Sequence, residues 1–235
     1  SFGLSYSSGP IRVTELRDQA RAMGYVVDNV FRNSHFGFYS YEAGGIHIIG
    51  NEYVDNVIYG LDPHDRTRGL TIALNTTYGT KVKHGIIISR EVDESIIAGN
   101  LTFDNAGSGI MLDRDSASTI IHANSSFNNA QDGITLFESS CNLMTNNSLV
   151  ANRRDGIKVR NSFDIAVYGN RIEANSGAGV NAYIANLLET KSGETRDFKL
   201  DPYDAVTTIS LRRNRISENG VGINSQGASG LAMFS

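Results

Sequence analysis

The 235-residue sequence lacks several features that would assign it to other classes of protein. A single cysteine, Cys141, excludes an internal disulfide. No apolar run approaches the roughly 18 residues of a membrane span. The net charge of −4, with both signs scattered, predicts neither nucleic acid nor a membrane surface as partner. With 40% hydrophobic residues, the chain can bury one continuous core, so we expect a single domain over residues 1–235.

What the sequence does contain is a repeat of about 24 residues. In each copy an asparagine is followed about ten residues later by an apolar residue. The pairs are Asn29/Phe38, Asn51/Leu61, Asn75/Ile86, Asn100/Ile110, Asn124/Ile134, Asn147/Ile157, Asn170/Val180 and Asn214/Ile223. The copies hold short runs of alternating apolar and polar residues, which bury an apolar face only when successive coils stack. The repeat therefore predicts an all-β parallel β-helix with coils of about 22–25 residues.

Asparagine and glycine recur at fixed places, and we interpret them as scaffold. The anchor asparagines predict one ladder of side-chain amides, and a second follows five residues later. Its members are Asn56, Asn105, Asn129, Asn152, Asn175 and Asn219. A glycine precedes the last strand of each coil, at Gly37, Gly60, Gly85, Gly109, Gly133, Gly156, Gly179 and Gly222. We expect the ladder asparagines to suit left-handed backbone and these glycines to mark bends with positive φ.

Two segments interrupt the repeat. Residues 1–24 form an irregular N-terminal segment or cap, in which Leu16, Ala20 and Met23 have helical spacing behind Thr14. Residues 187–203 are charged and fall within a 44-residue interval between two anchors, so they are predicted to form a loop insertion.

The last strand of each coil should project a stripe of polar side chains outward, because side chains alternate along a strand. Its most concentrated part is Tyr59-Gly-Leu-Asp62-Pro63-His64-Asp65-Arg66. Proline removes a hydrogen-bond donor from a stacked strand, so the residues of this coil are selected for a role other than strand pairing. A histidine between two aspartates has a fixed orientation, which suits a general base near neutral pH. The alternative is a surface histidine in a turn.

Arg90 follows the position that stacks on His64 one coil later, so the two should lie diagonally across neighbouring strands. An arginine fork pairs with a carboxylate through two hydrogen bonds. A base beside the α-carbon of a neutralised carboxylate is what proton abstraction from a uronic acid requires. Farther along the stripe, Arg114, Lys158 and Arg160 would hold other carboxylates of a polyuronate, although each alone is more often a solvated surface charge.

Two stretches closely resemble the mannuronan C5-epimerases, above all those of the bacterial periplasm: the motif at 59–66 and His84-Gly-Ile-Ile-Ile-Ser-Arg90. The likeness continues through Asp132-Gly-Ile-Thr-Leu-Phe-Glu138 and Asp155-Gly-Ile-Lys158-Val-Arg160, and covers about residues 25–205. It implies a right-handed parallel β-helix that converts β-D-mannuronate to α-L-guluronate inside alginate. By the same likeness His64 is the base and Arg90 the carboxylate neutraliser.

The resemblance also implies that Tyr59 and Asp62 complete the catalytic site. The remaining predicted site residues bind substrate: Asp65, Arg66, Arg114, Glu138, Lys158 and Arg160. The expected reaction removes H5 on one face of the sugar, and a water or Tyr59 returns a proton on the other. No essential metal is expected, calcium included. A periplasmic protein is expected, with secretion as the alternative, and alginate export proteins are possible partners.

Three other functions remain open from the residues. A polyuronate lyase begins with the same abstraction and then expels the 4-linked sugar. A glycoside hydrolase could use Asp113, Asp115 and Glu138, but these do not surround the coil of His64. A truncated solenoid could bind alginate without turning it over.

Overall fold

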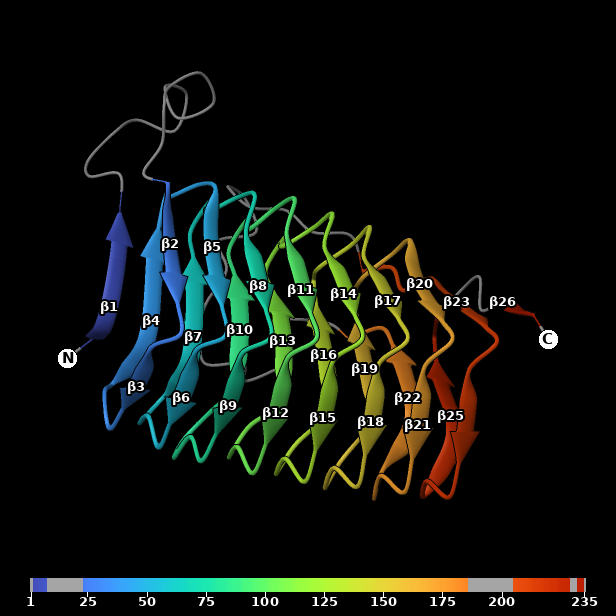
Figure 1. Cartoon of the computed structure of the whole chain (residues 1–235). Helices are drawn as coiled ribbons and strands as arrows, with labels where there is room; N and C mark the ends of the chain where they lie inside the picture. Colours follow the sequence, from blue (N-terminus) through green and yellow to red (C-terminus); the bar gives the residue numbers. More distant parts are fainter. Residues whose placement is uncertain (1, 8–22, 186–204, 229–231, 235) are drawn as a thin grey trace.

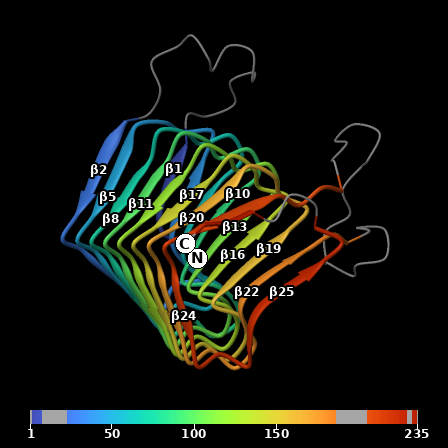
Figure 2. The same ribbon diagram turned by 90° about the vertical axis from the view of Figure 1, so that its right-hand side faces the viewer.

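The computed structural model describes residues 2–7, 23–185, 205–228 and 232–234. Within these residues every regular element is a β-strand, and the strands stack in parallel along one axis (Figure 1). Each coil contributes one strand to each of three sheets, which enclose the core (Figure 2). The predicted all-β parallel β-helix is confirmed.

The three sheets differ in which part of each coil they contain. Sheet 1 contains β1 (Phe2–Ser7), β4 (Phe36–Tyr41), β7 (Tyr59–His64), β10 (Ile86–Ser89), β13 (Ile110–Asp113), β16 (Ile134–Phe137), β19 (Ile157–Arg160), β22 (Ala178–Tyr183) and β25 (Val221–Gln226). Sheet 2 contains β2 (Gly24–Val27), β5 (Ile46–Ile49), β8 (Thr71–Ala73), β11 (Ile96–Ala98), β14 (Ile120–His122), β17 (Leu143–Thr145), β20 (Ile165–Tyr168), β23 (Ile209–Arg212) and β26 (Ala232–Phe234). Sheet 3 contains β3 (Val30–Arg32), β6 (Glu52–Val54), β9 (Thr76–Tyr78), β12 (Leu101–Phe103), β15 (Ser125–Phe127), β18 (Ser148–Val150), β21 (Arg171–Glu173) and β24 (Arg215–Ser217).

Aliphatic side chains stacked in register form the core. In sheet 1, Ile86 and Ile88 of β10 pair with Ile110 and Leu112 of β13, and all four are fully buried. The same pattern continues through β16 and β19. Because each such side chain contributes about 1.5–3 kcal/mol when buried, the repeated stack is the main source of stability. It also fixes which residues of each sheet 1 strand face outward.

The first predicted asparagine ladder is confirmed, and the second is confirmed except at Asn56. In the first, each amide donates from Nδ2 to Oδ1 of the next asparagine at 2.9–3.1 Å, from Asn29 to Asn214. The second ladder repeats this pattern from Asn105 to Asn219. Asn56 does not join it, because Thr80 holds the ladder position in the coil between Asn56 and Asn105. Left-handed backbone, however, lies one residue earlier than expected, as at Leu74 (φ 57°) and Ala123 (φ 53°). The asparagine itself must keep its amide in the buried stack, so the preceding residue makes the bend.

The prediction that the repeated glycines have positive φ is wrong. In the described part of the chain, neither Gly60 nor any of its equivalents has left-handed backbone. Glycine is needed at Gly60 because a Cβ there would lie 2.5 Å from the carbonyl oxygen of Gly85. At Gly85 a Cβ would lie 2.4 Å from Oγ1 of Thr77. Close approach between coils and across the core, rather than a bend, selects these glycines.

The 44-residue interval leaves the stack continuous. Asn170 donates to Asn214 at 2.9 Å, as two asparagines of adjacent coils do elsewhere. The predicted loop insertion at 187–203 and the helical spacing from Leu16 to Ala20 lie outside the described residues. No helix long and apolar enough to cross a membrane occurs in the part of the chain that the structure describes.

We expect Asn124→Ala to lower the free energy of unfolding by at least about 2 kcal/mol, because it leaves buried partners in two coils unpaired. Asn124 accepts from Asn100 and donates to Ile97 and Asn147, all within 3.0 Å. Urea unfolding followed by circular dichroism measures the loss. Gln131→Ala, which removes a partly exposed amide outside the ladders, is the control. Equal unfolding midpoints for the two variants would contradict the ladder's role.

Candidate active site

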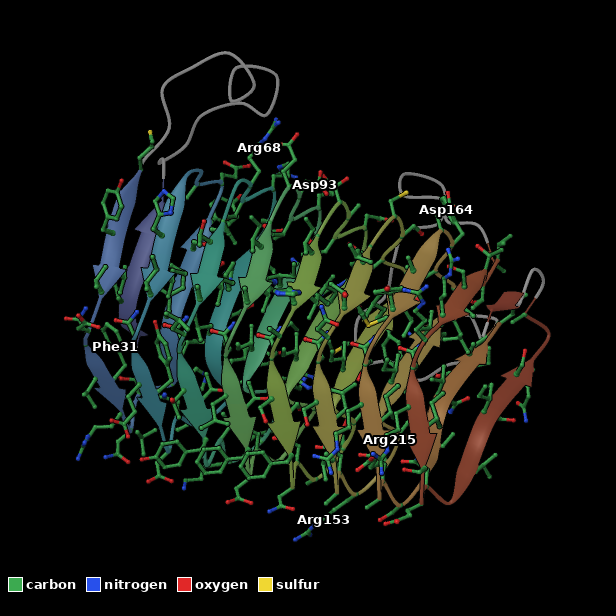
Figure 3. All side chains as sticks on the ribbon, turned by 45° about the vertical axis from the view of Figure 1, so that its right-hand side comes forward. Phe31, Arg68, Asp93, Arg153, Asp164 and Arg215 are labelled. Atoms are coloured by element: carbon green, nitrogen blue, oxygen red, sulfur yellow. The ribbon has the colours of Figure 1, made fainter. Side chains whose placement is uncertain are left out.

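The outer face of sheet 1 carries the predicted site residues. Arg68, Asp93 and Asp164 come after the sheet 1 strands of their coils and lie along one edge of the solenoid, whereas Arg153 precedes β19 and lies along the opposite edge (Figure 3). The candidate site therefore lies on the outer face of sheet 1, between these two edges and near the C-terminal ends of the strands.

Strand β7 loses part of its pairing where the motif lies. It pairs with β10 through Leu61 with Ile86 and through His64 with Ser89, on either side of Asp62 and Pro63. Proline has no N–H to donate, which explains the interruption. His64 and Ser89 are in register, as predicted, so Arg90 directly follows the residue beside His64.

Each central strand of sheet 1 ends in left-handed backbone. Residues with positive φ at these ends are Glu42, Asp65, Arg66, Arg90, Glu91, Arg114, Asp115, Glu138 and Asn161. The turns stack through backbone hydrogen bonds, for example from the Arg66 amide to the Arg90 carbonyl (2.8 Å). None of these residues is glycine, so each bend carries a conformational cost and also a functional side chain. One column of acidic and basic residues results at the strand ends.

Asp65 joins His64 to Arg90. Its Oδ2 accepts a hydrogen bond from Nδ1 of His64, and its Oδ1 lies 3.7 Å from Nη1 of Arg90. Partial burial opposes ionisation of Asp65, but the hydrogen bond from His64 and the charges of His64 and Arg90 hold its pKa below its ordinary value. An ionised Asp65 places the His64 proton on Nδ1, so Nε2 carries the lone pair of a general base.

Asp62 and Tyr59 occupy the more buried side of this cluster. Asp62 is 3% exposed, and burial raises its pKa to about 7. Burial also raises the pKa of Tyr59, and its ring stacks on that of His84 with 5.9 Å between centroids. The phenol thus remains protonated over the neutral range and can act as a proton donor.

Arg114 extends the cluster by one coil. Its Nη2 donates to Oγ of Ser89 at 3.1 Å, and its Nε donates to Oδ2 of Asp113 at 3.0 Å. These contacts direct its guanidinium across the strand toward the coil of Arg90. Because Ser89 is in register with His64 and Arg90 lies near Asp65, two arginines of adjacent coils are directed toward the coil of His64, as a polyanionic ligand would require.

Other predicted substrate-binding residues are engaged within the protein. Arg66 donates from Nη2 to Oε1 of Glu42 at 2.6 Å. Arg160 makes two hydrogen bonds to Glu138 (3.0 and 3.2 Å) and lies 3.7 Å above the centre of the Phe137 ring. Both members of that pair are more than nine-tenths buried. Their binding of substrate stays a prediction. In the structure they join neighbouring coils of sheet 1 through side-chain hydrogen bonds.

Lys158 is likewise held by its neighbours. Its Nζ lies 3.8 Å from Oδ2 of Asp132 and 3.6 Å from Oδ2 of Asp155. The stripe is also less exposed than its sequence suggested, since the predicted site residues Glu138 and Arg160 are each 6% exposed. Stacked side chains in neighbouring coils shield one another, which a pattern of alternation does not reveal.

A further column of polar residues was not predicted to act in the site. His84 Nδ1 accepts from the backbone amide of Ser108 at 2.9 Å. Asp132 and Asp155 accept from the backbone amide one coil on in the same way, at 2.9 and 2.8 Å. The sequence does mark the positions of these acceptors, because each of them directly precedes one of the repeated glycines. They fasten each coil to the next beneath the site.

Comparison with known proteins supports the same fold. A family model described as "Right handed beta helix region" matches residues 78–186. Among solved structures, the periplasmic alginate epimerase AlgG has a TM-score of 0.86 at 40% identity, covering 98% of this chain and 55% of that chain. The A-module of the mannuronan C-5 epimerase AlgE4 from Azotobacter vinelandii, at 13% identity and a TM-score of 0.62, shows likeness of fold alone. The predicted right-handed parallel β-helix is confirmed.

Curated relatives give a closer match in sequence. The chain is 51% identical over 94% of its length to a mannuronan C5-epimerase of Pseudomonas fluorescens. It is 46% identical, again over 94% of its length, to the mannuronan C5-epimerase AlgG of Azotobacter vinelandii. It spans 41% of the length of each of these relatives. The resemblance predicted from the motifs is confirmed.

Burial of His84 predicts a loss of stability in acid. Burial lowers the pKa of His84 from 6.5 to about 3, so below pH 6.5 the unfolded chain binds a proton that the folded chain does not. Its contribution is present above pH 6.5 and declines as the pH falls toward 3. We expect His84→Asn, which keeps an acceptor for Ser108, to reduce the fall in unfolding free energy between pH 7 and pH 4.

Urea unfolding at a series of pH values checks this prediction. His122→Asn, which changes an exposed histidine of β14, is the matched control and should leave the fall unchanged. An identical acid dependence in wild type and His84→Asn would show that His84 is not held neutral.

Proposed function

We propose that this chain carries the catalytic site of a mannuronan C5-epimerase, which converts β-D-mannuronate to α-L-guluronate within alginate. The observation that carries the proposal is the joining of His64 and Arg90 through Asp65 across two coils. A base and a guanidinium that converge on one sugar ring provide the two elements that C5 proton abstraction needs. Similarity to named mannuronan C5-epimerases over 94% of the chain supports it independently.

The reaction follows from the positions of these groups. Arg90 pairs with the C6 carboxylate and offsets the charge that accumulates there. His64 removes H5 through Nε2, while Asp65 holds Nδ1–H and stabilises the imidazolium that forms. The phenol of Tyr59, or a water, then returns a proton to C5 from the opposite face. Arg114 binds the carboxylate of a neighbouring sugar, since a sugar unit is about as long as the coil spacing of roughly 4.8 Å.

The proposal extends to location and partners. The solved structures of AlgG, at 41% and 40% identity, are of a periplasmic alginate epimerase, which supports a periplasmic site of action. Alginate or polymannuronate is the proposed ligand. Contact with proteins of an alginate export assembly would follow from that location.

We expect His64→Gln to lower epimerisation at least about 1,000-fold, because the base is lost while the shape is kept. Arg90→Lys should cost about 10- to 100-fold, because an ammonium replaces a two-pronged guanidinium. Proton NMR of polymannuronate, read at the anomeric guluronate signals, measures both. Arg153→Lys, at an exposed position on the opposite edge of the solenoid, should match wild type.

Three outcomes would overturn the assignment. Full activity in His64→Gln would remove the proposed base. Unsaturated sugar products, detected by their ultraviolet absorbance, would identify a lyase. Tight alginate binding by the wild-type chain without epimerisation would identify a binding solenoid instead.

We also propose that no metal is essential, because Arg90 supplies the charge compensation that a cation would otherwise give. Activity should stay within about twofold after treatment with EDTA and gel filtration. The same NMR assay checks it, with added calcium in a parallel sample. Loss of activity with EDTA that calcium restores would contradict the proposal.

A further inference from the structure

A buried carboxyl group with one unpaired oxygen lies in the middle of the candidate site. Asp62 is 3% exposed, and among the described residues its Oδ1 is buried without a hydrogen-bond partner. Tyr39 of β4 stands beside it in register, and Ile87 holds the equivalent position one coil on. No ion pair of Asp62 occurs in the part of the chain that the structure describes. A buried carboxylate in this position would be costly, whereas a neutral acid would not.

The cations near Asp62 are committed to other carboxylates. Charges from His64, Arg114 and Arg90 reach Asp62, but Arg90 pairs with Asp65 and Arg114 pairs with Asp113. Burial is the largest influence and outweighs these cations, raising the pKa of Asp62 to about 7. Asp62 is consequently uncharged in the lower part of the neutral range, while Asp65, three residues later, is ionised.

This difference between two neighbouring aspartates assigns them separate tasks. An ionised carboxylate at position 62 would repel the carboxylate of a bound uronate. A protonated one has an O–H to donate, and a polyuronate brings the acceptor that the buried site lacks. A carboxylic acid kept neutral by an apolar site is known to donate a hydrogen bond to an enolate oxygen in another enzyme class.

We propose, building on the epimerase function above, that Asp62 is a catalytic residue that binds the sugar carboxylate in its protonated form. Its carboxyl O–H donates to one carboxylate oxygen of the mannuronate, and Arg90 pairs with the other. When His64 removes H5, the electron pair of the C5–H bond moves into the C6 carboxyl group and forms a C5=C6 enediolate. The hydrogen bond from Asp62 strengthens as charge builds on that oxygen. Reprotonation at C5 returns the electron pair, and Asp62 keeps its proton.

The pH dependence follows from the groups that face Asp62. Tyr39 and Tyr59 have raised pKa values and stay neutral, and Asp65 has a lowered pKa and stays ionised. The guanidinium groups of Arg90 and Arg114 keep their charge at every pH used. His64, whose charge also reaches Asp62, completes the set. Loss of the Asp62 proton should therefore lower activity on the alkaline side of about pH 7.

The first test compares kcat/KM against pH for wild type, Asp62→Asn and Asp62→Ala with polymannuronate. Wild-type kcat/KM should fall by about tenfold per pH unit above the midpoint, since one proton is lost. Asp62→Asn keeps a neutral donor, so it should retain activity within roughly 10- to 30-fold at pH 6 and lose the alkaline decline. Asp62→Ala should lose at least about 1,000-fold. Asp104→Asn, at an exposed corner with φ 52° that asparagine tolerates, should match wild type.

The second test needs no activity. In protein labelled with ¹³C at the aspartate carboxyl carbons, the resonance missing from Asp62→Asn should titrate near pH 7. The melting temperature of Asp62→Asn should exceed that of wild type at pH 8 and match it near pH 4. The sign follows because a raised folded-state pKa makes the wild-type contribution decline as pH rises through that pKa.

The outcomes separate this proposal from the epimerase function. Titration of Asp62 near pH 4, or an Asp62→Asn variant as inactive as Asp62→Ala, would overturn the protonated-donor role while leaving the epimerase function intact. If the wild-type chain does not epimerise, that function fails, and binding of mannuronate oligomers at pH 6 and pH 8 then decides the role of Asp62. Weaker binding at pH 8 in wild type but not in Asp62→Asn would support it, and equal dependence on pH in both would overturn it.

Discussion

Register between coils is the constraint on which the rest of this structure depends. Every outward residue of sheet 1 acquires its neighbours from the coil before and the coil after, so a slip of one residue would turn His64 inward. Buried amides of the asparagine ladders and the side chains that accept backbone amides, such as His84, hold that register. Since the ladder bonds are buried, water does not compete for them.

The site uses this register to combine residues from separate coils. His64 and Asp65 come from one coil, Arg90 from the next and Arg114 from the one after. Left-handed backbone at the strand ends directs the last three toward the same region of the outer face of sheet 1. The conformational cost of bending at aspartate or arginine rather than glycine is repeated in each coil, which indicates that the side chains are required there.

Much of this arrangement could be predicted from the sequence because repetition makes register visible. The spacing of asparagines was enough to place Ser89 beside His64 and thus Arg90 within reach of Asp65. Details that depend on packing were not predictable in this way. Positive φ was expected at Gly60, where close approach of the Gly85 carbonyl is the actual reason for glycine. Alternation along a strand could not show that Arg160 is held by Glu138 and Phe137, or that Asp62 is buried.

The hydrogen bond from Asn170 to Asn214 has a consequence for how such proteins can change. Two coils separated by 44 residues stack as closely as coils separated by about half that number. The stacking therefore does not depend on the length of chain inserted between Asn170 and Asn214. Natural selection, or a protein engineer, can therefore graft new segments there and alter what reaches the polymer without disturbing the catalytic residues.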